Sequence, residues 1–201
     1  MPVFAKKIGF KEKMKMPEEM NAYGSVDEEL NVQSKRILHD WLTKAIEDND
    51  RELFAHCVSV LGTSWNVKRT VKSTVFGDFV NHLWEKVPDI KDGSYRWQNE
   101  GEAFSYQSGG KTKHAYSYES KVCFAIAPAQ YKIIYDTNTC KHLKAVLHRQ
   151  RRIVLATFAD AVNEWCAANN IDTASEDALY RADYALWSGE AVVQANNGGN
   201  E

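Results

Sequence analysis

Hydrophobic residues recur at helical spacing through most of the first half of the chain. Over residues 34–49 they repeat at i, i+1, i+4 and i+5, which places an apolar stripe on one face of a helix. Residues 50–62 repeat the pattern behind Asp50, a favourable N-cap. Residues 75–84 repeat it again before Pro88, which we expect to end that helix.

Further helical patterns, separated by short breaks, fill the second half of the chain. They cover residues 117–127, 136–147, about 151–166 and 173–187, and Pro128 ends the first of them. Side chains able to accept a hydrogen bond from the first turn open several of these segments, namely Ser117, Asp136 and Thr173, the last with Glu176 at capping-box spacing.

Residues 88–116 interrupt the helical pattern with a polar, glycine-rich stretch, and the sequence contains no long strand signal and no repeat. Helices joined by short loops are typical of a mainly α fold. We predict a single-domain bundle of about six to eight helices with one long irregular loop or small hairpin around residues 88–116. Residues 1–33 are predicted to be an N-terminal arm, residues 34–188 the helical domain and residues 189–201 a flexible tail.

The composition is that of an ordinary globular chain. Its 201 residues are 44% apolar and 26% charged, which suffices to bury a core within one domain. The net charge of −2 neither indicates nor excludes a nucleic-acid partner. No segment has the length and apolarity of a secretion signal or a membrane span, so we expect a cytoplasmic protein without a membrane partner. The scattered cysteines favour a reducing compartment: Cys57, Cys123, Cys140 and Cys166.

Basic residues cluster in the long loop and in and after the helix that follows Asp136. Three of them share one helical face at i, i+3 and i+7, where they can contact phosphate. The alternative is a solvated face with cations near a helix C-terminus. The candidate DNA contacts are Lys111, Lys113, Lys141, Lys144, His148, Arg149 and Arg152. The glycine-lysine stretch 109–113 lacks the setting of a nucleotide-binding loop and predicts a turn.

Aromatic residues alternate with cations in the same long loop. Trp97, Phe104 and Tyr106 are candidates for stacking on an unpaired base. The alternative is that these rings cover the hydrophobic core, because aromatic side chains bury so much area.

Histidine and cysteine spacing indicates no metal site. Neighbours such as Cys140 and His142 do not converge on one ion from a helix, and no C-x-x-C or H-E-x-x-H spacing occurs. We therefore predict neither a metal nor a cofactor.

Lys121 and Asp136 stand near the starts of two consecutive predicted helices. A lysine attacks carbon only as the neutral amine, so its pKa must be lowered by burial and by the positive end of its own helix. A carboxylate nearby can stabilise a cationic transition state or accept a proton. The alternative is a solvated lysine and an aspartate that only caps its helix.

The order of these residues resembles the helix-hairpin-helix DNA glycosylase superfamily, above all its bifunctional, 8-oxoguanine-type members. The matching segments are Lys121–Ile126 and Ile133–Asn138. The resemblance implies that Lys121 attacks the sugar C1′ of an extruded nucleotide, that Asp136 assists, and that the partner is double-stranded DNA. It also implies a glycosylase-like domain over residues 34–188.

The chain departs from the family pattern at several places. Residues 114–120 lack the glycine hairpin that binds a DNA phosphate in the family, and Asn138 replaces the usual histidine. A C-terminal four-cysteine cluster is absent, which excludes the iron–sulfur branch. The leading hypothesis is a DNA N-glycosylase/AP lyase. The alternative is a non-enzymatic α-helical module that binds nucleic acid or a protein, including a catalytically silent accessory protein.

Overall fold

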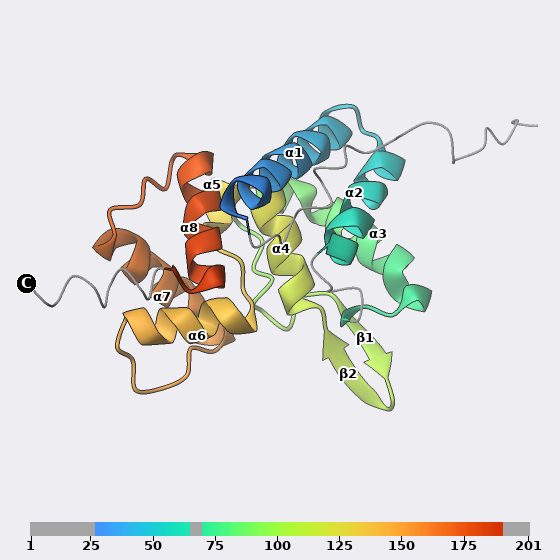
Figure 1. Ribbon diagram of the computed structural model, residues 1–201. Helices are drawn as coiled ribbons and strands as arrows, with labels where there is room; N and C mark the ends of the chain where they lie inside the picture. Colours follow the sequence, from blue (N-terminus) through green and yellow to red (C-terminus); the bar gives the residue numbers. More distant parts are fainter. Residues whose placement is uncertain (1–26, 65–69, 191–201) are drawn as a thin grey trace, which may run out of the picture.

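The computed structural model describes residues 27–64 and 70–190, and these are mainly helical with one small hairpin (Figure 1). The mainly α, single-domain fold predicted from the sequence is confirmed, and the irregular stretch contains the hairpin. The elements are α1 (Glu28–Glu47), α2 (Arg51–Ser64), the 3₁₀ helix η3 (Ser73–Val75), α3 (Phe76–Lys91), β1 (Ser105–Ser108), β2 (Lys111–His114), α4 (Tyr116–Ile126), α5 (Pro128–Tyr131), α6 (Thr137–Val146), α7 (Leu155–Ala168) and α8 (Glu176–Ser188).

Helix α4 is the central element, with α1, α2, α3 and α5 in contact with it. Every residue of Tyr118–Ile126 is buried. Helical periodicity by itself indicates one apolar face, whereas the neighbouring elements cover every side of this part of α4. Polar residues of this helix, Glu119 and Lys121 among them, must therefore find their partners inside the protein.

Strands β1 and β2 pair antiparallel, with Ser105 opposite His114 and Ser108 opposite Lys111. Gly109 and Gly110 connect them with φ angles of 60° and 72°. Positive φ at both loop positions is the geometry of the tight hairpin turn that glycine favours. Each strand has only 4 residues, mostly exposed or half-buried, which is why the hydrophobic pattern gave no strand signal.

Helix α1 begins earlier than its hydrophobic pattern. Asp27 caps it by accepting a hydrogen bond of 3.0 Å from the first turn. Val32 is then buried in a small cluster with Phe124. Residues 28–33 therefore belong to the helical domain and not to the predicted arm, whereas residues 1–26 lie outside the described residues.

Two predicted helix boundaries, at Pro88 and at Ser117, are wrong. Pro88 lies inside α3, which continues to Lys91 although the proline cannot donate one of the backbone hydrogen bonds of the helix. Ser117 lies inside α4, whose N-cap is Ala115. Its hydroxyl is engaged by Lys121 and does not cap the helix.

The last helices also begin later than predicted. Helix α7 starts at Leu155 and not near residue 151. Ser175, and not Thr173, caps α8 by accepting a hydrogen bond of 3.3 Å from the backbone of Ala178. Helix α8 ends at Gly189, which has a left-handed φ of 88°. Of the predicted tail, residues 191–201 lie outside the described part of the chain.

Candidate functional site

Lys121 is enclosed within the bundle and is only 2% exposed. Its ammonium donates to Ser117 Oγ at 3.0 Å and to the Ser117 carbonyl oxygen at 3.4 Å, one turn earlier on α4. Burial lowers the pKa of Lys121 to about 8, and the charges of Asp136 and then Asp183 oppose that shift. At neutral pH about a tenth of such amines is uncharged, far more than for an exposed lysine.

Asp136 is the N-cap of α6, as predicted. Its carboxylate accepts a hydrogen bond of 2.8 Å from the backbone of Thr139. The same carboxylate is the strongest of the neighbouring charges that favour the protonated form of Lys121. The structure thus places the two predicted catalytic side chains within electrostatic reach of each other.

A buried ion pair that the sequence analysis did not identify lies beside them. Lys35 on α1 and Asp183 on α8 are 2.8 Å apart, with side chains 1% and 2% exposed. Burial lowers the pKa of Lys35, while Asp183 and, more weakly, Asp136 oppose that shift. Lys35, Lys121, Asp183 and the half-buried Asp136 therefore form a cluster with equal numbers of positive and negative charges, which we call the buried charge cluster.

A signal for Lys35 and Asp183 is present in the sequence. Lys35 stands three residues before Leu38 and seven before Leu42, on the buried stripe of α1. Asp183 stands four residues after the buried Leu179. A charged residue on an otherwise apolar stripe predicts a buried pair, because burying a single charge is costly.

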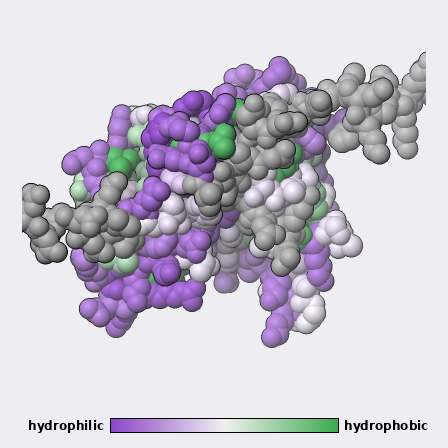
Figure 2. Space-filling model, in the orientation of Figure 1, coloured by the Kyte–Doolittle hydropathy of each residue, from purple (hydrophilic) through white to green (hydrophobic). Residues whose placement is uncertain are grey.

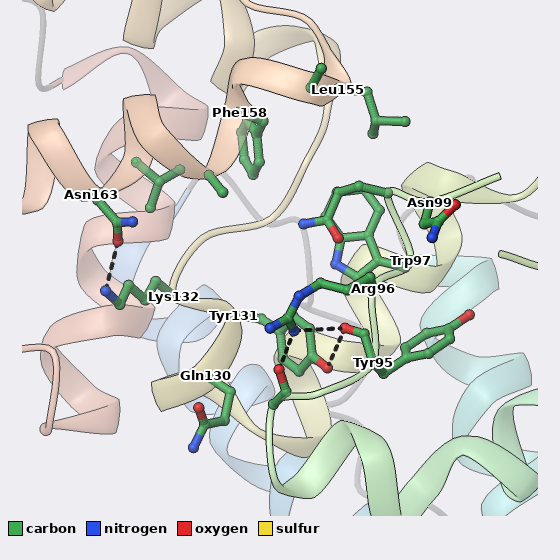
Figure 3. A pocket seen from close by; sticks show the side chains of 15 residues that line it. Tyr95, Arg96, Trp97, Asn99, Gln130, Tyr131, Lys132, Leu155, Phe158 and Asn163 are labelled. Atoms are coloured by element: carbon green, nitrogen blue, oxygen red, sulfur yellow. Dashed lines mark hydrogen bonds between the residues drawn. The ribbon is translucent and has the colours of Figure 1, made fainter. Parts of the chain in front are cut away.

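A cleft of about 650 Å³ opens away from the buried charge cluster, at the start of α7 (Figure 3). Residues 93–99, α5 and α7 supply its walls. Lys121 and Asp136 line neither this cleft nor a second one of about 770 Å³ between α7 and α8. The lining consists of Gly93, Tyr95, Arg96, Trp97, Gln98, Asn99, Gln130, Tyr131, Lys132, Leu155, Ala156, Phe158, Ala159, Val162 and Asn163.

Trp97, predicted to stack on a base, is 2% exposed at the wall of this cleft. Its ring lies 5.6 Å from that of Tyr135 and 6.4 Å from that of Phe158, measured between ring centroids. The indole Nε1 and the neighbouring Gln98 Oε1 are buried and have no hydrogen-bond partner among the described residues. An unsatisfied buried group costs about 1–3 kcal/mol of stability, so a polar partner for either atom would be stabilising.

Both cations of the cleft are held by neutral groups. Arg96 donates to the Gly93 carbonyl oxygen, and Lys132 donates to Asn163 Oδ1 at 2.7 Å (Figure 3). Lys132 has φ 55° and ψ −54°, and the backbone on either side of it closes a hydrogen bond of 2.6 Å. This is the rare, strained form of the γ-turn, and strained backbone of this kind costs about 1–3 kcal/mol.

The other two predicted stacking residues pack elsewhere. Phe104 lies 5.3 Å from Phe79 of α3 and 6.2 Å from Tyr106, between ring centroids. The Tyr106 hydroxyl donates to the Thr70 carbonyl oxygen at 2.7 Å. These two rings join the hairpin to α3, and Trp97 contacts a different set of side chains.

The predicted phosphate-contacting cations occupy two surfaces. The first consists of Lys111 and Lys113, the hairpin cations. They are exposed on β2, on the same face of the hairpin as Tyr106. The second is formed by Lys141, Lys144 and Arg152, which are exposed on or just after α6. Figure 2 shows that hydrophilic residues predominate over α6 and along the hairpin.

His148 and Arg149 do not extend the helical face of Lys141 and Lys144. Helix α6 ends at Val146, so the predicted i, i+7 relation to His148 is wrong. His148 has φ 49°, and the backbone bonds from His148 to Ala145 and from Arg149 to Lys144 close a Schellman motif. The Arg149 guanidinium forms an ion pair with Glu164 of α7.

The described residues, 27–64 and 70–190, offer neither a metal site nor a membrane span. Within these ranges, no group of three or more His, Cys, Asp or Glu side chains could hold a metal ion. Nor does any helix there combine the length and the apolarity needed to cross a membrane.

Comparison with protein-family models, curated proteins and solved structures gave no match. The fold and the sites therefore define the protein only as a mainly α domain with a buried charge cluster, a polar cleft lined by aromatic side chains, and exposed basic surfaces. The resemblance to DNA glycosylases stays a prediction from the sequence.

Proposed function

We propose that this protein is an α-helical nucleic-acid-binding module. One observation carries the proposal: the exposed cations on the hairpin and on α6 have no ion-pair partner among the described residues. Cations on α1 and α8, by contrast, are paired, as in Arg36 with Asp177 and Arg181 with Glu28. Basic side chains left uncompensated in a chain of net charge −2 are suited to contact phosphate.

The sequence around these cations supports the proposal. Residues 103–118 and 137–159 contain no Asp or Glu. The second stretch carries five Lys or Arg residues, of which Arg149 is paired within the protein and Lys141 and Lys144 are exposed. The positive potential of both stretches is therefore not cancelled locally, which favours an extended polyanion as the partner.

Salt dependence of binding tests the proposal. Binding of labelled single-stranded and duplex DNA about 20 nucleotides long is measured by fluorescence anisotropy as salt is raised from about 50 mM. Each lost phosphate contact lowers the steepness of log K against log salt by about 0.9 on duplex DNA. Two double variants each remove two such contacts, and we expect each to lower the steepness by about 1.8. They are Lys111→Gln with Lys113→Gln, and Lys141→Gln with Lys144→Gln.

The matched control replaces cations that are held in ion pairs. Lys44→Gln with Lys86→Gln removes the same charge from α1 and α3 and should leave the salt slope unchanged. The proposal fails if the wild type does not bind, or if both test pairs behave like this control.

A second candidate function is a lysine-dependent DNA glycosylase/AP lyase. The specific observation that favours it is the lowered pKa of Lys121, about 8, beside Asp136. The neutral amine would attack C1′ and expel the base with its bonding electrons. The new ammonium then loses a proton, and cleavage of the bond between C1′ and the ring oxygen opens the sugar and leaves a protonated imine. Asp136 would stabilise the positive charge that develops on the sugar. Because Lys121 is 2% exposed, a substrate must first displace the side chains that bury it.

Borohydride trapping separates the two functions. An imine between Lys121 and an abasic sugar is reduced by hydride to a stable amine, which appears as a covalent protein–DNA adduct. We expect Lys121→Gln to abolish the adduct and Lys86→Gln to leave it intact. If the native protein gives no adduct with abasic DNA or across a broad panel of damaged bases, the enzymatic function is excluded, while the binding function is judged by the salt slopes.

A further inference from the structure

We propose that the cleft between residues 93–99, α5 and α7 is a binding site for one nucleotide, either free or unpaired within a strand. For a nucleotide that is unpaired within a strand, the inference rests on the proposed function. It is separate from the buried charge cluster, since neither Lys121 nor Asp136 lines the cleft.

The charge of the lining indicates an anionic ligand. Arg96 and Lys132 are its charged members, and no Asp or Glu is among the lining residues. Both cations are already positioned, Lys132 by Asn163 and Arg96 by backbone carbonyl oxygens, and neither forms an ion pair among the described residues. The Glu102 carboxylate accepts from the Arg96 backbone N–H and from Asn99 but does not line the cleft. Asp92 is close enough to feel the Arg96 charge, but it does not line the cleft. A phosphate held by these cations would receive charge-assisted hydrogen bonds.

The unsatisfied polar atoms indicate that the ligand has polar edges. Trp97 Nε1 is a donor and Gln98 Oε1 an acceptor, both buried and without a partner among the described residues. Trp97 is 2% exposed, so that its N–H is withdrawn from bulk water. Both atoms are closed off from solvent, so a ligand contacts them only once these side chains turn toward the cleft; the edge of a nucleobase presents both acceptors and donors and can then satisfy both. The carboxamides of Gln130 on α5 and Asn163 on α7 add further adaptable partners among the lining residues.

The shape of the cleft suits a flat ring. Helix α7 contributes Ala156 and Ala159, whose short side chains leave space between Leu155 and Val162. Figure 3 shows the rings of Tyr131 and Trp97 on the wall that faces α7. A volume of about 650 Å³ lies within the range of small-molecule sites and leaves room for base, sugar and phosphate.

Other ligand classes fit these features less well. An inorganic anion would use the two cations but would leave the aromatic walls and the buried indole N–H unoccupied. A purely apolar ligand would leave Arg96, Lys132 and the unsatisfied atoms without partners, at a cost in affinity. A nucleotide uses the cations, the rings and the polar atoms together.

Calorimetric titration with AMP, CMP, GMP and UMP tests the site, with the corresponding nucleosides as a second series. We expect at least one monophosphate to bind, and its nucleoside to bind about tenfold more weakly because the charge-assisted bonds are lost. Ala159→Phe fills the cleft from an exposed position of α7 and should abolish binding. Lys132→Gln should weaken the monophosphate about tenfold and the nucleoside hardly at all.

Matched variants report on the protein outside the cleft. Ala167→Phe adds the same ring to another exposed position of α7, outside the lining, and should bind like the wild type. Trp97→Phe keeps a ring and removes the N–H; a circular dichroism melt shows that the variant is folded. No monophosphate binding at about 5 mM overturns the inference. So does binding that Ala159→Phe leaves unchanged.

Competition distinguishes the two sources of the nucleotide. If a monophosphate displaces labelled single-stranded DNA, the cleft binds an unpaired nucleotide of a strand. If the monophosphate binds without displacing the DNA, the cleft binds a free nucleotide. Either result supports the site. Mononucleotide binding does not depend on the hairpin and α6 cations, so a failure of the cleft and a failure of the proposed function give different results.

Discussion

The ammonium of Lys35 and the carboxylate of Asp183 meet at 2.8 Å in the interior and join the first described helix to the last. Lys35 also donates to the Tyr180 carbonyl oxygen at 3.2 Å. The second oxygen of Asp183 accepts the backbone N–H of Ile134 at 2.8 Å. A single carboxylate thus connects α1, α8 and the segment that carries Asp136, which makes the pair a structural centre of this half of the bundle.

Removing one partner of this pair should destabilise the protein strongly. Asp183→Asn or Lys35→Met leaves the other group buried without its countercharge, and we expect a loss of about 3–5 kcal/mol in the free energy of unfolding by urea. The double variant Lys35→Met with Asp183→Leu should recover most of this loss, since the uncompensated charge is gone. Lys44→Met, which breaks the exposed pair with Asp48, should cause no measurable change. Single variants as stable as Lys44→Met would contradict the buried pair.

The close contact between α2 and α4 gives a second prediction. A Cβ atom on Gly62 would lie 1.9 Å from the Tyr118 hydroxyl oxygen, which donates to the Val58 carbonyl oxygen at 2.6 Å. Gly62→Ala must displace that ring, and we expect a loss of about 1–3 kcal/mol in stability. Adding Tyr118→Phe should recover part of it, because the hydroxyl no longer clashes.

Gly77 is the matched control for this substitution. A Cβ there meets no atom within 4 Å, on an exposed turn of α3. Gly77→Ala should therefore raise stability by up to about 1 kcal/mol, through helix propensity and a less flexible unfolded chain. Equal effects at the two glycines in urea denaturation would argue against the packing of Tyr118 on α2.

Helical periodicity predicted the existence of most helices but not their ends. The apolar stripes of α1 and α2 and the caps at Asp50 and Asp136 follow from local sequence, because each cap bonds to its own first turn. Pro88 and Ser117 were misassigned for tertiary reasons. Helix α3 continues past its proline with Val87 and Ile90 buried in the core, and the Ser117 hydroxyl accepts a hydrogen bond from the buried Lys121.

The Schellman motif at the end of α6 gives a third prediction. His148 takes the left-handed position with φ 49°, where a side chain is strained and glycine is not. His148→Gly should raise the free energy of unfolding by about 0.5–1 kcal/mol. Lys144→Gly, inside the same helix, should lower it by about 1 kcal/mol. Thermal melts of both variants check this, and a destabilised His148→Gly would contradict the assigned turn.

The site was less predictable than the fold. The sequence identified Lys121, Asp136 and Trp97 as chemically interesting, but it did not show that α4 is covered on every side. Periodicity reports one buried face and says nothing about helices that pack on the others. The cleft combines residues from three separate segments, and no spacing in the sequence brings Arg96, Lys132 and Phe158 together.

The pH dependence of stability isolates the environment of Lys121. Its pKa is about 8 in the folded protein and near its ordinary value of 10.5 when unfolded. Between these two values the unfolded chain binds a proton at Lys121 that the folded protein has lost, so the contribution of Lys121 to stability rises with pH across this window. Relative to Lys121→Met, the wild type should gain up to about 3 kcal/mol from pH 8 to 10.5.

Comparison of the two proteins removes contributions that they share. Burial raises the pKa of Cys57 to about 12 and that of Cys140 to about 11. Both groups therefore lower stability as the pH rises, and they do so equally in the wild type and in Lys121→Met. Urea midpoints at successive pH values measure the difference. Relative to Lys44→Met the wild type should show no such gain, because the hydrogen bond to Asp48 raises the pKa of Lys44. If the difference between wild type and Lys121→Met stays flat to pH 10 and falls above it, Lys121 is held as a tight cation, and its amine is not available as a nucleophile near neutral pH.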